Sequence, residues 1–171
     1  MNLLTLFVWM LFGIFNTPDA KSKEVFNLIN AYRIKNGKSA LKFCDTLAYV
    51  ASVHAYDQFV NYRFDDRTCS MHSWSVSDKW KGGCISEDKS DSDWSIMWDK
   101  PYELIGMKQE GYEISYMYDP KTTPIDPKEV VEGWIKSRGH RNCMIERGWN
   151  TQFKRMGVGI YQGHINVWFA E

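Results

Sequence analysis

Two amphipathic patterns near the start of the chain predict helices. Residues 22–36 carry apolar side chains at helical spacing, with Ser22 as a candidate N-cap and Gly37 at the end. Residues 46–62 show the same spacing after Asp45, a residue type that caps helix N-termini. His54 falls on the apolar face of this second helix. We therefore expect His54 to be a packed helix residue.

The last third of the chain predicts a helix and then a β-hairpin. Asp126 followed by Pro127 is a strong helix start, because Pro is favoured at the first helical position, and Gly139 is the expected end. A turn at Gln162 and Gly163 separates two alternating apolar sets: Val158 and Ile160, then Ile165, Val167 and Phe169. A shorter strand is expected around residues 111–118. Helices that cover hairpin-joined strands predict an α+β fold with an antiparallel sheet.

The segment from about residue 64 to 100 has no regular period, and it is long for a loop without structure. Packed tryptophans and a disulfide would be needed to order it. Its acidic stretch holds Asp88, Asp91 and Asp93, which could contact Ca²⁺. The spacing is not that of an EF-hand loop, so we interpret the stretch as a solvated loop.

The first twenty residues differ from the rest of the chain. An uninterrupted apolar run covers residues 3–15, which is too short to span a bilayer comfortably. It resembles the central region of a secretory signal, although no Lys or Arg precedes it. We expect residues 1–20 to be a signal peptide and residues 21–171 to be one domain. An uncleaved anchor and a buried N-terminal helix are the alternatives.

The overall composition is that of a globular protein and excludes some partners. Hydrophobic residues make up 44% of the 171 and charged residues 25%, which is enough apolar material for a core. Lys plus Arg number 21 and Asp plus Glu also number 21, and no basic stripe is present. Nothing in this balance suggests nucleic acid or a polybasic membrane surface. The aromatic content of 15% predicts a core that is rich in aromatic side chains.

Four cysteines in a secreted chain favour two disulfides, for which three pairings exist. Cys69 with Cys84 is the most local pairing, and it would leave Cys44 with Cys143. No C-x-x-C pair occurs, so a zinc–thiolate site is not expected.

Four histidines are the candidates for chemistry. His164 lies at the hairpin turn, and we expect it at a solvated tip. His72 and His140 instead lie in connecting segments near cysteines and tryptophans. Loops that are fixed to a scaffold are where functional polar residues concentrate.

Six segments occur in the order seen in one known family: "FNLINAYR", "LKFCDTLAYVASVHA", "MHSW", "GYEISY", "EVVEGWIKSRGHR" and "MGVGIYQGHINVWFAE". With them the chain resembles the CAP superfamily of cysteine-rich secretory, antigen 5 and pathogenesis-related proteins. It is most similar to the simpler bacterial-style branch. The resemblance implies a three-layer α-β-α sandwich with a central groove.

In this family two His and two acidic residues usually line the groove. The resemblance carries the histidines to His72 and His140, and the first acidic residue to Glu113. Glu103 is a rival for that position, and spacing favours Glu113. The second acidic position is Ser137 here, so the chain departs from the full set of four.

Two histidines facing one cavity could hold Zn²⁺ weakly, with Glu113 orienting a ligand. The alternative is that His72, Glu113 and His140 form a buried network that only braces the fold. The resemblance implies a secreted protein that binds a small apolar ligand, such as a sterol or lipid, or an extracellular protein. We expect a monomer or weak dimer. The alternative function is a peptidase-like, metal-dependent hydrolase that uses His72, His140 and Glu113, with Glu113 as its base.

Overall fold

The strand with the clearest apolar alternation, β4 (His164–Ala170), lies inside the sheet and is buried on both faces. Ile165, Val167 and Phe169 enter one hydrophobic core, whereas Trp168 and Ala170 enter a second core on the other face. The computed structural model that shows this describes residues 19–61, 68–86, 93–119 and 124–171. Strand alternation thus divides the interior into two cores, one on each side of the sheet.

The sheet has four strands in the order β1-β3-β4-β2. β3 (Arg155–Tyr161) and β4 form the predicted hairpin, and its turn residues Gln162 and Gly163 both have positive φ. β2 (Tyr112–Met117) pairs antiparallel with β4, as expected for a short strand there. β1 (Lys42–Phe43) pairs parallel with β3, so the sheet is mixed rather than purely antiparallel. Two residues are too few to show an alternating pattern, which is why the sequence did not reveal β1.

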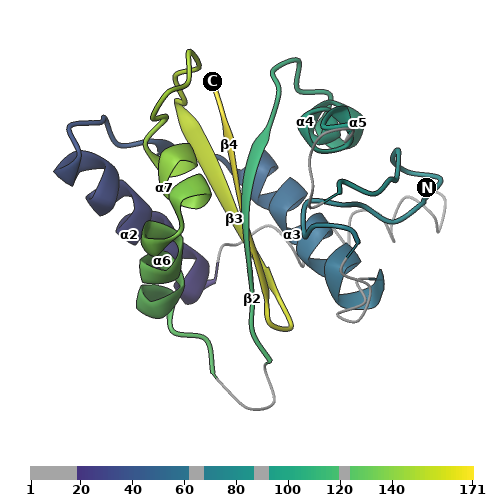
Figure 1. Cartoon of the computed structure of the whole chain (residues 1–171), viewed down its shortest axis with the longest axis horizontal. Coiled ribbons are helices and arrows are strands. Elements are labelled where there is room, and N and C mark those ends of the chain that lie inside the picture. Colours follow the sequence, from purple (N-terminus) through teal and green to yellow (C-terminus); the bar gives the residue numbers. More distant parts are fainter. Residues whose placement is uncertain (1–18, 62–67, 87–92, 120–123) are drawn as a thin grey trace, which may run out of the picture.

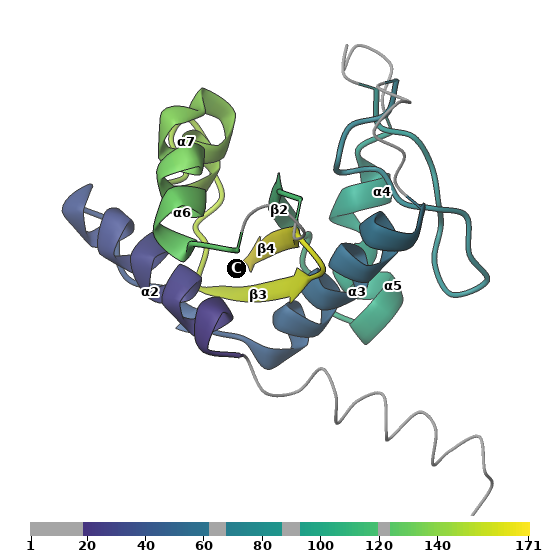
Figure 2. The same cartoon turned by 90° about the horizontal axis from the view of Figure 1, so that it is seen from below.

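Helices cover both faces of the sheet (Figure 1). One layer contains α2 (Ala20–Lys35), α6 (Pro127–Lys136) and α7 (Arg138–Met144). The other contains α3 (Asp45–Asn61), α4 (Ser95–Trp98) and α5 (Lys100–Ile105). Figure 2 shows the sheet between these two layers. The predicted α+β three-layer sandwich is confirmed, and the irregular segment ends in two short helices that the sequence did not indicate.

Two helix ends differ from the predictions. α2 begins earlier than expected, because the side chain of Asp19, not Ser22, caps it by accepting from the Ser22 amide at 2.8 Å. α6 starts at Pro127 as predicted, but it ends at Lys136. The extended backbone of Ser137 then leads directly into α7. His140 therefore lies within a short helix, not in a loop after one.

The closest contact between a helix and the sheet depends on the glycines of β3. A Cβ atom on Gly157 would lie 2.0 Å from the backbone nitrogen of Ala48, and one on Gly159 would lie 2.2 Å from that of Ser52. Both distances are far below van der Waals contact, so α3 can pack against β3 only because these positions lack side chains. This contact fixes the position of the face of α3 that carries His54.

One of the two disulfides that the sequence suggested is present. Cys69 and Cys84 form the predicted disulfide, but Cys44 and Cys143 are free thiols. Cys143 belongs to the core beneath α2 and α6, whereas Cys44 packs against the core beneath α3. The sheet separates these two cores, so the predicted pairing of Cys44 with Cys143 was wrong.

His164 is not at a solvated tip. It is the first residue of β4, is 5% exposed and lies near the ring of Phe59. The turn was predicted correctly, but the end of α3 covers the strand at this point. Burial lowers the pKa of His164 to about 4, and the charge of His54 contributes to the same shift.

Two predictions concern segments outside the described residues: the signal peptide, of which residues 1–18 are not described, and the acidic loop, of which residues 87–92 are not. None of the helices in the described ranges has both the length and the apolar composition needed to cross a bilayer.

Candidate functional site

The loop that carries His72 is anchored at its ends by local bonds. The Cys69–Cys84 disulfide closes it, and the amide of Ser70 donates to the carbonyl of Ile85 at 2.7 Å. Trp74 and Gly83 exchange backbone hydrogen bonds of 3.1 and 2.9 Å. The irregular segment is therefore ordered by a disulfide and by short β-bridges, as its length required.

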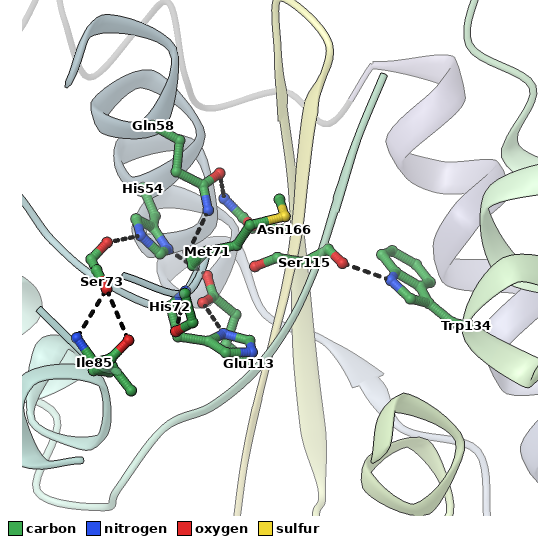
Figure 3. A network of polar contacts seen from close by, with 11 residues as sticks. His54, Gln58, Met71, His72, Ser73, Ile85, Glu113, Ser115, Trp134 and Asn166 are labelled. Carbon is green, nitrogen blue, oxygen red and sulfur yellow. Dashed lines mark hydrogen bonds and ion pairs between the residues drawn. The ribbon is translucent and has the colours of Figure 1, made fainter. Parts of the chain in front are cut away.

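Three polar residues of α3 bond to the same loop, and Figure 3 shows two of them, His54 and Gln58. His54, Asp57 and Gln58 follow the i, i+3, i+4 spacing, so they share one helix face. Gln58 Nε2 donates to the carbonyl of Met71 at 2.6 Å, and His54 Nε2 donates to that of Ser73 at 3.0 Å. The Asp57 carboxylate accepts from the amide and the hydroxyl of Ser75. These side chains position the backbone on both sides of His72.

Glu113 of β2 lies between two histidines. His54 Nδ1 is 2.5 Å from Glu113 Oε1, and His72 Nδ1 is 2.9 Å from Oε2. The carboxylate is completely buried, as is the His54 side chain, whereas His72 is 20% exposed. Burial alone would raise the pKa of Glu113. The charge of His54 and the hydrogen bonds from both rings outweigh burial and lower the pKa to about 2.

The hydrogen bonds define the protonation of His54. Its Nε2 faces a carbonyl oxygen, which can only accept, and its Nδ1 faces an ionised carboxylate, which can also only accept. When Glu113 is ionised, both ring nitrogens of His54 donate, and in that state the two residues form a buried ion pair. The ring also stacks on Trp74, with centroids 4.1 Å apart and planes within 6°.

The same carboxylate orients His72. Since Nδ1 of His72 donates to Glu113, Nε2 is the nitrogen left for the cavity beside it. In a neutral ring this nitrogen carries a lone pair, which can accept a hydrogen bond or bind a cation. Glu113 thus contributes to the cavity by orienting His72, and its own carboxylate is buried away from the cavity.

A cavity of about 930 Å³ lies above the outer edge of β2. His72, Trp94, Met97 and Trp98 line one side, and Ser137, His140 and Trp149 line the other. Glu113 and Ser115 form part of the floor between them. A volume of this size is typical of small-molecule sites.

The structure brings the sequence candidates His72, Glu113, Ser137 and His140 to this one cavity. The rival Glu103 lies elsewhere. Its carboxylate accepts from the buried Lys100 ammonium at 2.7 Å and from the Lys81 amide at 3.1 Å. Among the two glutamates, Glu113 is therefore the one beside the groove histidines.

Sequence reasoning missed the role of α3 in this site. His54 was expected to be a packed helix residue, which it is, but its ion pair with Glu113 was not foreseen. Asp57 and Gln58 were not considered at all. One signal was available: Gln58 continues the buried face of the helix as a polar residue, and such residues need partners.

The fit of these residues to a metal is limited. Within the described ranges, no group of three or more His, Cys, Asp or Glu side chains could hold a metal ion. Both oxygens of Glu113 are engaged by histidines, so it is not a further ligand. His72 and His140 alone fall short of the three protein ligands that catalytic zinc sites use. Zinc binding by this pair stays a prediction.

The sequence comparison identifies the family of this chain. Residues 26–168 match the sequence profile of the cysteine-rich secretory protein family, CAP. The chain belongs to this family. It is 26% identical over 138 residues to a protein of Bacillus subtilis (strain 168) named uncharacterized membrane protein YlbC, a match that covers 81% of this chain and 31% of that protein.

Three solved structures show the same fold at low sequence identity. An extracellular protein with an SCP domain from Bacillus anthracis is 20% identical, with a TM-score of 0.61 over 90% of this chain and 41% of its own. An outer surface protein from Borrelia burgdorferi is 17% identical, with a TM-score of 0.60 over 91% and 95%. A cysteine-rich secretory protein from Staphylococcus aureus is 15% identical, with a TM-score of 0.58 over 88% and 38%. This chain spans about a third of the curated relative and about two fifths of two of the structures.

Proposed function

We propose that this chain is an extracellular CAP domain that binds an apolar ligand or a segment of a protein partner in the groove above β2. The observation that supports this most is the chemistry of the cavity. Trp94, Met97, Trp98 and Trp149 offer apolar surface, while His72 and His140 offer polar contacts at the same site. Apolar walls with a few convergent polar groups are the usual composition of a binding pocket.

The carboxylate geometry favours binding over hydrolysis. A general base must reach the proton it removes and must have a pKa near the working pH. Glu113 is completely buried, both its oxygens accept from histidines, and its pKa is lowered to about 2. Its arrangement suits a residue that holds His72 in place. The metal-dependent hydrolase that would use Glu113 as its base is therefore disfavoured.

An extracellular location is supported by three independent features. The apolar run at residues 3–15 resembles a secretory signal, and the Cys69–Cys84 disulfide is typical of oxidising compartments. Similar structures include an extracellular protein and an outer surface protein. The curated relative is named a membrane protein, so anchoring through the apolar run is the competing outcome. The N-terminal sequence of the expressed chain, measured by mass spectrometry, would decide between cleavage and anchoring.

Binding can be tested with the full chain and two probes, a fluorescent sterol and a fluorescent fatty acid. We expect saturable binding of at least one probe, because the groove exposes aromatic surface. Trp149→Ala, which removes a groove residue, should weaken binding about tenfold or more. Native mass spectrometry of the purified chain would reveal any ligand that it retains.

Tyr102→Ala is the matched control, since Tyr102 is 64% exposed but lies outside the groove. Its affinity should equal that of the unchanged chain. Equal affinities for Trp149→Ala and Tyr102→Ala would place the probe elsewhere and contradict the groove. If neither probe nor any peptide binds, the proposed function is wrong.

A further inference from the structure

The outer edge of β2 faces the groove with its main chain. In an antiparallel pair, alternate residues direct their N–H and C=O groups toward the partner strand. The amide of Tyr118 donates to the carbonyl of Gly163, on the side where β4 lies, so the even-numbered residues of β2 face β4. The odd-numbered residues, Glu113 and Ser115 among them, therefore direct their main-chain groups away from the sheet.

Two bonds confirm this alternation from the outer side. The indole Nε1 of Trp134 on α6 donates to the carbonyl of Ser115 at 2.9 Å. The amide of Gly111 donates to the carbonyl of Trp98, which belongs to α4. Both partners come from the helical layers that flank the groove, not from another strand. In the part of the chain that the structure describes, no strand pairs with this edge.

The exposure of Glu113 identifies which of its atoms line the cavity. The whole residue is 5% exposed, but its side chain is 0% exposed. The surface that Glu113 contributes to the cavity is therefore main chain. Glu113 and Ser115 both direct their main-chain groups away from β4. The N–H and C=O of Glu113 and the N–H of Ser115 therefore face the groove.

We propose that the occupant of the groove is an extended peptide segment that pairs antiparallel with β2 as an added strand. The proposal rests on the groove-binding function above and names its ligand class. Outward-facing main-chain donors and acceptors at a strand edge are what an added strand needs, and antiparallel pairing continues the β2–β4 geometry. The main chain would supply affinity, and the walls would supply selectivity.

The geometry defines which peptide positions matter. The peptide residue opposite Glu113 exchanges two hydrogen bonds with it. The residue opposite Ser115 lies two positions earlier in the peptide, and its C=O accepts from the Ser115 amide. Its own N–H faces the Ser115 carbonyl, which Trp134 already engages. This earlier position therefore tolerates a residue without an N–H, such as proline.

Selectivity would come from the two walls. Side chains alternate across a strand, so successive peptide residues point to opposite sides of β2. One set lies toward His72 and Trp94, and the other toward His140 and Trp149. We expect apolar or aromatic side chains in both sets, with a hydrogen-bonding group near either histidine.

The test starts with random seven-residue peptides displayed on phage and selected on the full chain. A selected peptide is then synthesised as a series with one N-methylated amide at each position. We expect one position to lose affinity about tenfold or more, because it loses a hydrogen bond and gains a clash, and the position two residues earlier to stay within about threefold. Uniform tolerance of N-methylation along the peptide would overturn the proposal.

Amide hydrogen exchange gives a second, structural readout. Ile114 and Tyr116 bond to β4 and should exchange slowly with or without peptide. Glu113 and Ser115 should exchange at least about tenfold more slowly once the peptide is saturating, because their N–H groups become paired. Unchanged exchange at these two residues would overturn strand addition.

Ser115→Pro removes the outward N–H without removing a bond to β4, and Ser115→Ala is its matched control. The first should weaken the peptide about tenfold and the second less than threefold. If Ser115→Pro does not fold, the N-methyl series decides alone. If the sterol or fatty-acid probe enters the groove but no peptide does, this inference fails while the proposed function stands.

Discussion

Replacing Glu113 tests the buried network most directly. In Glu113→Ala, the His54 ring loses its counter-charge inside a region that is 0% exposed, and His72 loses the partner of its Nδ1. Removing one partner of a buried ion pair costs about 3–5 kcal/mol. For a domain of this size, 1 kcal/mol shifts Tm by about 2–4 °C, so we expect a loss of about 10 °C.

Glu113→Gln should behave differently although it also removes the charge. The amide oxygen can still accept from His72 Nδ1. The amide nitrogen can donate to His54 Nδ1, provided that His54 gives up one proton and keeps the other on Nε2 for Ser73. Every buried polar group then keeps a partner, and the expected cost is about 1 kcal/mol.

Thermal unfolding measured by circular dichroism compares the two variants, with Glu132→Ala on the exposed face of α6 as the control. Nitrogen NMR of His54 should show two protonated ring nitrogens in the unchanged chain and one in Glu113→Gln. The reasoning is refuted if Glu113→Ala lowers Tm by less than about 3 °C, or if Glu113→Gln lowers it as much as Glu113→Ala.

The remaining predictions concern the scaffold. The pKa of His164 is lowered to about 4 from the usual 6.5, so the unfolded chain binds this proton at a higher pH than the folded chain does. The free energy of unfolding should therefore fall by about 2 kcal/mol as the pH drops from 6.5 to 4. Denaturant titrations should show this slope, and His164→Phe should remove it. Gly157→Ala should destabilise by about 3 kcal/mol or more, because its Cβ would meet the backbone of Ala48; denaturant unfolding measures this loss. Alkylation followed by mass spectrometry should label Cys44 in the folded chain but Cys143 only after unfolding, since Cys143 is buried and burial raises the pKa of its thiol.

Each of these three predictions has a result that would contradict it. An unchanged pH slope in His164→Phe would assign the acid sensitivity to other groups. Full stability of Gly157→Ala would mean that α3 can move away from β3 without loss. Protection of both Cys44 and Cys143 from alkylation until reduction would restore the disulfide between them.

The parts of the fold that the sequence predicted are those that local chemistry controls. The start of α6 at Pro127 follows from its Asp126 cap, and the hairpin follows from alternation around Gln162 and Gly163. α3 begins at Asp45, which is the first helical residue and not the predicted cap. The disulfide of Cys69 with Cys84 spans only 15 residues. The family resemblance added the three-layer arrangement and brought His72, Glu113 and His140 to one site.

The errors come from contacts that no local pattern contains. The predicted disulfide between Cys44 and Cys143 did not take account of the sheet that lies between them. The prediction that His164 is exposed did not take account of the end of α3, which covers it. Burial and pairing at these positions depend on which distant elements pack there. A sequence pattern indicates which face of a helix or strand is buried, but it does not indicate which other element packs against that face.

The sequence by itself determined the elements, the family and the candidate histidines, because period, capping and motif order are written along the chain. Only the tertiary structure decided what those residues do together. Glu113 meets His54 across 59 residues and His72 across 41, and the close packing of α3 against the glycines of β3 brings them into reach. That packing buries the carboxylate and leaves His72 beside the groove. The main chain of β2 faces the groove for a separate reason: within the described residues β2 is an edge strand, so one of its sides has no partner strand.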